Sequence, residues 1–412
     1  MKNKTSFSIF VIGALFFVFG FVTWLNSVLI PFLKTACELS DAKASLVPFA
    51  FYISYFVMAI PSSSILKKTG FANGMALGLI IMAIGSLVFV LAAVERNYLL
   101  FLIGLFTQGT GLALLQTATN PYVTIIGPIE SAAQRMSIMG ICNKIAGMIG
   151  ILILAHVLFS STNSLVESLD TITNITLREE VFKKLFNSVV FPYLVMTIVL
   201  VGLVLFIKLA KLPEISEEEQ EEEMRTKNSI FAYPYLWFGI AAIFFYVGVE
   251  VLAIDYLIVY AKKLQIPTEI SKYYPVAALS ALVVGYLVGI VLVPKFISQR
   301  ISLIINALLG ISLLFVALYT TGKISVYAII ALSFTHAIMW PAIWPLSIHN
   351  LGRHTKLASA FLIMGIAGGA FLPLIYGILS DKFNAQWAYC VMLPGYIYLV
   401  LFATFLCKIK KW

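Results

Sequence analysis

The stretch FSIFVIGALFFVFGFVTWLNSVLIPFL, which covers residues 7–33, contains no charged side chain. A helix needs about 20 predominantly apolar residues to cross the hydrocarbon core of a bilayer. The stretch is too long for the apolar core of a signal peptide and lacks a small-residue cleavage site, so we interpret it as a retained membrane span. This run therefore predicts an integral membrane protein.

Comparable apolar runs recur along the whole chain of 412 residues. About twelve of them are long enough to span a membrane, which predicts an all-α membrane protein. The expected spans are 7–33, 44–66, 71–94, 97–125, 134–160, 189–210, 231–260, 270–294, 299–320, 324–350, 355–380 and 385–408. An even number of spans places both termini on the same side of the membrane.

The composition argues against a soluble enzyme and against a nucleic-acid-binding protein. Hydrophobic residues make up 61% of the chain and charged residues 11%, whereas soluble proteins have about 25% charged residues. The net charge of +9 is spread over short loops, a distribution typical of the positive-inside rule, and it predicts cytoplasmic termini. No P-loop, nucleophile motif or metal-ligand spacing is present, so we expect no catalytic residue, no metal site and no cofactor other than a coupling ion, Na⁺ or H⁺.

One charged tract, KLPEISEEEQEEEMR from Lys211 to Arg225, separates six apolar runs from six others. We interpret it as a solvated cytoplasmic linker. The predicted organisation is an N-terminal six-helix bundle at 1–210, the acidic linker at 211–230 and a C-terminal six-helix bundle at 231–412.

The two halves resemble repeats of one unit. Residues 138–141 and 363–366 both read IMGI, and they follow Gly127 and Gly352 at the same distance. Duplicated halves are common in transporters, which bind substrate where the repeats meet.

Three charged residues lie deep inside predicted spans: Lys144 in the fifth, and Glu250 and Asp255 in the seventh. Charges in hydrocarbon cost about 2.5–3.5 kcal/mol or more, so these residues are candidate coupling groups. Glu250 and Asp255 are separated by roughly 140° around a helix and are expected to face different directions. Two structural alternatives stay open: a static salt bridge between Glu250 and Lys144, and an Asp255 that simply reaches water at the outer end.

Amide side chains in the same spans are candidate substrate ligands. They are Asn26 in the first span, Gln116 and Asn120 in the fourth, and Asn143 in the fifth. Gln116 and Asn120 share one helix face at i and i+4. Amides offer donors and acceptors, which suits a neutral polyhydroxy ligand; hydrogen bonding between helices is the alternative role.

The tenth span reads HAIMWPAIWPLS from His336 to Ser347. His336, Trp340 and Trp344 are four residues apart and are expected to lie along one face, with the prolines loosening the helix. Indole rings pack well against the CH faces of sugars, so the two tryptophans are candidate binding residues. His336 is a candidate ligand or proton carrier, with a satisfied core histidine as the alternative.

Several of these motifs are similar to those of a known family. GFVTWLNSVLIPFLK at 20–34, QTATNPY at 116–122 with the Gly-Pro pair at 127–128, and WPAIWP at 340–345 through GIAGGA at 365–370 resemble the fucose–galactose–glucose:proton symporters of the major facilitator superfamily. The resemblance covers most of the chain and is closest to the bacterial glucose/galactose branch. It implies two bundles around a central cavity, alternating access and a hexose substrate.

The chain departs from this family at two positions. The fucose member carries acidic residues where Ser27 and Gln116 stand here, so its proton coupling cannot be transferred. The sequence motif around Glu250 resembles the glucose branch, which includes sodium-dependent relatives. Coupling by Glu250 with Lys144 is therefore a hypothesis that leaves the ion open.

Together these features predict a secondary active transporter that imports a neutral hexose of the glucose or galactose type, coupled to H⁺ or Na⁺. An uncoupled sugar facilitator, a carrier of fucose or an amino sugar, a multidrug exporter and a polytopic membrane enzyme are the alternatives. We expect a monomer in the plasma membrane, the inner membrane of a bacterium, that contacts lipid and sugar but no nucleic acid.

Overall fold

A computed structural model describes residues 2–125, 132–160, 175–210, 229–293, 295–348, 351 and 354–407. The elements in these ranges are helices, and no strand occurs among them. This follows from the apolar sequence, because a chain inside a bilayer must satisfy its own backbone hydrogen bonds. The expected all-α membrane fold is confirmed.

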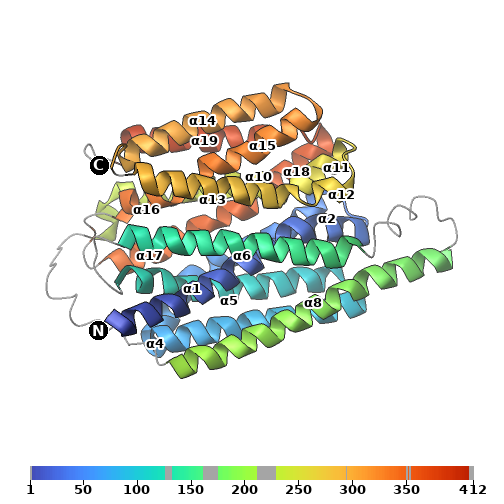
Figure 1. Cartoon of the computed structure of the whole chain (residues 1–412), viewed down its shortest axis with the longest axis horizontal. Coiled ribbons are helices and arrows are strands. Elements are labelled where there is room, and N and C mark those ends of the chain that lie inside the picture. The colour runs from blue at the N-terminus through green and yellow to red at the C-terminus, as the bar shows by residue number, and fades with distance from the viewer. Residues whose placement is uncertain are drawn as a thin grey trace.

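The helices are arranged side by side along the long axis of the molecule (Figure 1). The first bundle contains α1 (Lys2–Trp24), α2 (Asn26–Ala36), α3 (Asp41–Ala44), α4 (Leu46–Glu95), α5 (Tyr98–Ile125), α6 (Ala132–Ser160) and α8 (Ile175–Ala210). The second contains η2 (Ile230–Ala232), α10 (Pro234–Asp255), α11 (Leu257–Lys263), α12 (Thr268–Ser271), α13 (Tyr274–Leu292), α14 (Gln299–Tyr319), α15 (Gly322–His336), α16 (Met339–Ile348), α17 (Thr355–Met364), η4 (Gly365–Ala367), α18 (Gly368–Lys382), η5 (Trp387–Val391), α19 (Met392–Leu401) and η6 (Phe402–Leu406). Most of the predicted acidic linker lies outside the described residues, so its boundaries stay a prediction.

Within the described ranges, eleven helical segments are long and apolar enough to cross a membrane. One of them includes α4, whose 50 residues far exceed a single crossing. The helix breaks at Gly70, which has φ 75° and ψ 172°, a conformation essentially restricted to glycine. The chain doubles back there, since the Tyr98 hydroxyl donates to the Lys43 carbonyl at 2.6 Å. Because α4 supplies two crossings, the described helices account for the expected twelve.

Several predicted spans are interrupted, and two of the breaks lie beside candidate residues. The first span is interrupted at Leu25, between α1 and α2. The tenth was expected as one helix at 324–350, but α15 ends at His336 and α16 begins at Met339. Pro341 explains the second break, because a proline ring clashes with the carbonyl four residues earlier, here that of Ala337.

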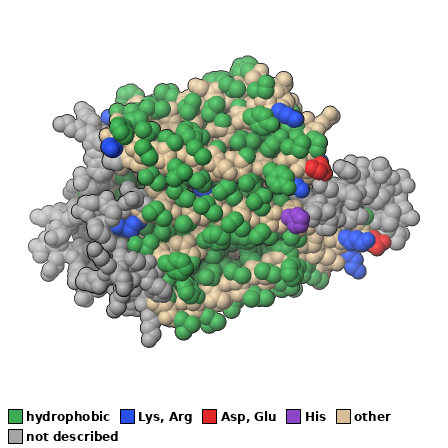
Figure 2. All heavy atoms as spheres, in the orientation of Figure 1, with side chains coloured by type: hydrophobic (Ala, Val, Ile, Leu, Met, Phe, Trp, Pro, Cys, Tyr) green, Lys and Arg blue, Asp and Glu red, His purple; other side chains and the backbone are tan. Residues whose placement is uncertain are grey.

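Apolar side chains cover most of the face shown in Figure 2, and the visible acidic and basic side chains lie mainly toward its two ends. Large hydrophobic residues remain exposed on the protein surface, among them Ile198 at 72% and Leu209 at 80%. Such a surface is stable only in contact with lipid.

The two bundles pack against each other through a few helices, and this interface positions the candidate site. Helix α6 packs on α13, while α4 packs on α17, η4 and α18. At one such contact Gly369 faces the ring of Tyr52, and a Cβ there would come within 2.9 Å of a ring atom. Glycine is required at that position for the helices to approach this closely.

Candidate functional site

The centre of the candidate site is an ion pair between the two bundles. Lys144 of α6 donates to Glu250 Oε1 of α10 at 2.9 Å. The residues are only 7% and 6% exposed. Each charge would be costly without the other, because a single buried charge costs several kcal/mol. The pair therefore connects the two bundles through side chains of opposite formal charge.

Trp24 and Asn143 complete the first-bundle side of this pair. The Trp24 indole donates to Asn143 Oδ1 at 3.1 Å, and Lys144 Nζ lies 4.2 Å from the centroid of the Trp24 ring. A cation over an indole face is stabilised by the ring quadrupole. Gly147 makes room for this ring, since a Cβ there would lie 2.3 Å from the Trp24 Cδ1 atom.

Aromatic residues of the second bundle lie beside the ion pair. The rings of Trp340 and Trp344 stack with centroids 5.4 Å apart, and both side chains are half-buried. Trp340 also contacts Tyr246, at 6.1 Å between ring centroids. Tyr246 lies one helical turn before Glu250 on α10 and interacts with it electrostatically. The aromatic group and the ion pair thus share one face of α10.

His336 does not continue the row of the two tryptophans. It is fully buried, and its Nε2 lies 2.7 Å from the Tyr396 hydroxyl. The break before Pro341 interrupts the expected continuous helical face of three rings. The Nδ1 atom of His336 has no hydrogen-bond partner among the described residues, and Lys144 interacts with the ring electrostatically, so the ligand or proton role of His336 stays a prediction.

The remaining amides lie on the first-bundle side. Gln116 of α5 donates to the Tyr55 hydroxyl at 3.0 Å, and the Tyr55 ring stacks on Tyr52 at 6.3 Å. Tyr52 interacts electrostatically with Glu250, which connects this group to the ion pair. Asn26 is 1% exposed and Asn120 is 7% exposed.

Asp255 occupies a different position from the one expected. One alternative from the sequence was a side chain that reaches water, but Asp255 is 0% exposed. Neither carboxyl oxygen has a hydrogen-bond partner in the described residues. Asp255 is five residues after Glu250, about 7.5 Å further along the helix axis. The simple solvent-facing alternative is therefore wrong.

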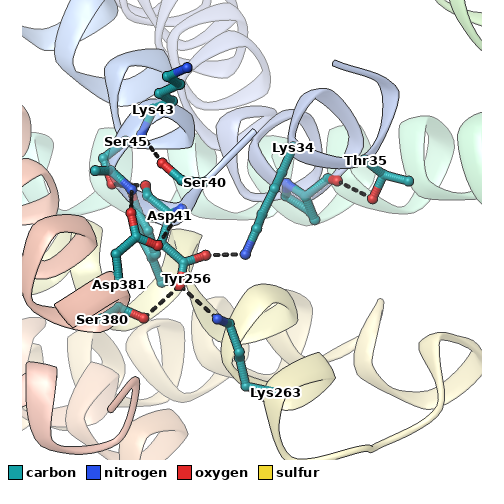
Figure 3. A network of polar contacts seen from close by, with 12 residues as sticks. Lys34, Thr35, Ser40, Asp41, Lys43, Ser45, Tyr256, Lys263, Ser380 and Asp381 are labelled. Atoms are coloured by element: carbon teal, nitrogen blue, oxygen red, sulfur yellow. Dashed lines mark hydrogen bonds and ion pairs between the residues drawn. The ribbon is translucent and has the colours of Figure 1, made fainter. Parts of the chain in front are cut away.

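A second polar cluster joins the bundles at one end of the molecule (Figure 3). We call it the Asp41 clasp, and it consists of Lys34, Asp41, Lys263, Ser380 and Asp381. Asp41 pairs with Lys34 of its own bundle, and Asp41 Oδ2 accepts from Lys263 at 3.0 Å and from Ser380 at 2.6 Å. Lys263 and Ser380 belong to α11 and α18 of the second bundle.

Backbone N–H groups of the first bundle also bond to the second bundle at this place. The Asp381 carboxylate accepts from the Asp41 and Ala42 N–H groups, both at 2.8 Å. Gly377 of α18 lies so close that a Cβ would be 2.1 Å from Ser45 Oγ. The clasp thus closes this end of the bundle interface.

Sequence reasoning missed several of these residues. The clasp had no detectable signal, because its members are far apart in the sequence and lie near span ends, where charges are common. Trp24 and Tyr246 could have been found, since each lies in the same span as a candidate residue, whereas the expected span of Tyr55 contains none. Only their contacts separate them from many other aromatic residues of the chain.

Comparison with known proteins identifies the family. Residues 12–369 match the family described as Major Facilitator Superfamily. A protein named glucose/galactose transporter of Brucella abortus (strain 9-941) is 32% identical over 404 residues, which are 97% of this chain and 94% of the relative. The L-fucose-proton symporter of Escherichia coli (strain K12) is 29% identical over 378 residues, 89% of this chain and 85% of the relative.

A solved structure has the same fold over nearly the full length. It is described as the major facilitator superfamily transporter FucP in the outward conformation, and it matches with a TM-score of 0.74 at 27% sequence identity. The match covers 98% of this chain and 99% of that one. The expected twelve-helix, two-bundle architecture is thereby confirmed.

Proposed function

Because this chain belongs to the major facilitator superfamily, we propose that it is a secondary active transporter for a neutral hexose of the glucose or galactose type, coupled to a cation. The observation that carries the proposal is the buried Lys144–Glu250 ion pair, which connects the bundles beside amide and indole side chains. Relatives named as glucose/galactose transporters and as an L-fucose-proton symporter support a sugar substrate.

Sugar recognition is assigned to two kinds of side chain. Asn143, together with Asn26, Gln116 and Asn120 of the same bundle, offers donors and acceptors to hydroxyl groups. Trp340 and Trp344 offer stacked indole faces to the apolar side of a pyranose ring. The first group belongs to one bundle and the indoles to the other, so a sugar held by both would favour closure of the bundles around it.

Coupling is assigned to the Lys144–Glu250 pair. When a cation binds to Glu250, or a proton neutralises it, the ammonium group of Lys144 loses its counter-charge. The two bundles then lose the contact that joins them at this depth. Cation binding and bundle movement are thereby linked through one carboxylate.

For the membrane orientation, we propose cytoplasmic termini in a plasma membrane, the inner membrane if the cell is a bacterium. The Asp41 clasp then faces the outside, because it follows the first crossing from the cytoplasm. In this orientation the structure has its outer side closed. We further propose that a single chain is the functional unit.

The test is uptake of radiolabelled hexoses by the purified protein in proteoliposomes. We expect glucose or galactose counterflow, and accumulation only when an inward proton or sodium gradient is applied. Glu250→Gln should reduce gradient-driven accumulation at least tenfold relative to counterflow. Glu180→Gln is the matched control, since Glu180 is exposed and pairs with Lys184 on the surface of α8.

Two results would contradict parts of the proposal. Accumulation that is the same with and without every gradient would favour the uncoupled facilitator. The absence of counterflow with any hexose, fucose or amino sugar would remove the sugar substrate itself.

A further inference from the structure

The α10 helix contains a second buried carboxyl group whose situation differs from that of Glu250. Asp255 is 0% exposed, and both of its oxygens are without a hydrogen-bond partner in the described ranges. Buried polar groups are nearly always paired, so each exception needs an explanation. An ionised carboxylate in this position would carry the full desolvation cost with no bond to offset it.

The titratable groups around Asp255 do not remove that cost. Its electrostatic interactions are with Glu250 on the same helix and with Lys144 from α6. Tyr52 from α4 and Tyr256 at the end of α10 also interact with it. Lys144, the cation among them, is already bonded to Glu250 at 2.9 Å. The negative charge of Glu250 would add repulsion to an ionised Asp255, and the neighbouring cation is already engaged.

We propose that Asp255 is a second coupling site of the transport cycle, which binds a proton in addition to the cation that the proposed function assigns to Glu250. In the closed arrangement a proton is bonded to one of its carboxyl oxygens. On deprotonation that O–H bond breaks, the electron pair stays on the carboxylate, and the proton passes to water. No redox partner or other reactant is required.

The position of Asp255 gives this proton a controlled route. The residue lies between the Lys144–Glu250 pair and the Asp41 clasp along the axis of α10. The next residue, Tyr256, donates from its hydroxyl to Ser45 Oγ of the first bundle at 2.7 Å. Opening of the clasp breaks this contact and admits water to the carboxyl group from that end. Closure then traps the proton at 0% exposure.

The same geometry favours a proton over a sodium ion. A metal cation requires several oxygen ligands at short range, and the Asp255 oxygens have no polar partner in the described part of the chain. A proton needs only the carboxyl group itself.

This inference rests on the proposed transport function, but it has a readout that does not require transport. Infrared difference spectra between neutral and alkaline pH report the C=O stretch of a carboxyl group that is still protonated at neutral pH, where surface carboxyl groups are ionised. We expect such a band in the purified wild-type protein at neutral pH. It should disappear in Asp255→Asn and persist in Glu250→Gln. Absence of the band in the wild type, or its persistence in Asp255→Asn, would overturn the assignment.

The second arm measures coupling in proteoliposomes. In Asp255→Asn the ratio of proton-gradient-driven uptake to counterflow should fall at least tenfold, and Asp255→Glu should recover part of it because the proton site is restored. The surface variant Glu180→Gln again serves as the control. An unchanged ratio in Asp255→Asn, or wild-type accumulation driven by sodium alone, would contradict the inference. If the wild type shows no hexose counterflow, the proposed function fails while the infrared result still decides the proton site.

Discussion

Removal of either partner of the Lys144–Glu250 pair should destabilise the protein strongly, whereas removal of both should not. The variants are Lys144→Met, Glu250→Gln and the double variant. Each single substitution leaves one charge buried between the bundles, and the double substitution leaves none. The stability of these four proteins forms a double-mutant cycle that isolates the interaction.

The structure gives the scale of the effect. At the observed N–O distance of 2.9 Å the gross attraction is roughly 6 kcal/mol for an effective dielectric constant of about 20. Loss of one partner of a buried pair typically costs about 3–5 kcal/mol of unfolding free energy, while loss of both is often neutral. We therefore expect a coupling energy of at least about 3 kcal/mol between the two sites.

The assay is reversible unfolding in mixed micelles by titration with sodium dodecyl sulfate, followed by tryptophan fluorescence. The pair Glu180–Lys184 is a matched control, because its side chains are 61% and 60% exposed and 3.6 Å apart. Its cycle should give only about 0.3–0.5 kcal/mol. Equal coupling energies for the two pairs, or single variants within 1 kcal/mol of the wild type, would refute the claim that Lys144 and Glu250 form a buried charge pair.

Three further outcomes are expected. Trp340→Ala should weaken hexose binding about tenfold through loss of a stacking face, as measured by calorimetry. The control variant Trp387→Ala, at a half-exposed tryptophan, should leave the affinity unchanged. If Trp340→Ala lowers the affinity and the protein yield equally, Trp340 has a packing role instead. Gly377→Val should hold the Asp41 clasp open, since the Cβ of the new side chain would overlap the Ser45 hydroxyl. The distance between spin labels placed on the two bundles at that end should therefore increase. The control Gly202→Ala, whose Cβ meets nothing within 4 Å, should leave that distance unchanged. Burial raises the pKa of the Cys37 thiol from 9.0 to about 11, so below pH 9 its alkylation by maleimide should be about 100-fold slower than that of a thiol with the ordinary pKa. Its rate, followed by mass spectrometry, should keep rising above pH 9, and a plateau there would contradict the burial.

Much of the candidate site could be anticipated because charge inside hydrocarbon is expensive. Lys144 and Glu250 were recognisable as a potential pair from their depth in two spans, and the structure brings them to 2.9 Å. The contact between Trp340 and Trp344 followed from their spacing of four residues. Asp255 could not be placed in this way, because position along a span does not say whether a neighbouring helix covers the side chain.

The amino-acid sequence by itself determined that this protein lies in a membrane, how many times the chain crosses it and how deep each charged residue lies within its span. These properties depend on local composition, since a bilayer requires about 20 apolar residues for each helix wherever that helix lies. The partners of Asp41, the isolation of Asp255 and the separation of His336 from the tryptophans were decided only by the tertiary structure. Each of these depends on which helices of the two bundles meet and on where along their axes they meet. Those contacts join residues that are tens to hundreds of positions apart in the chain.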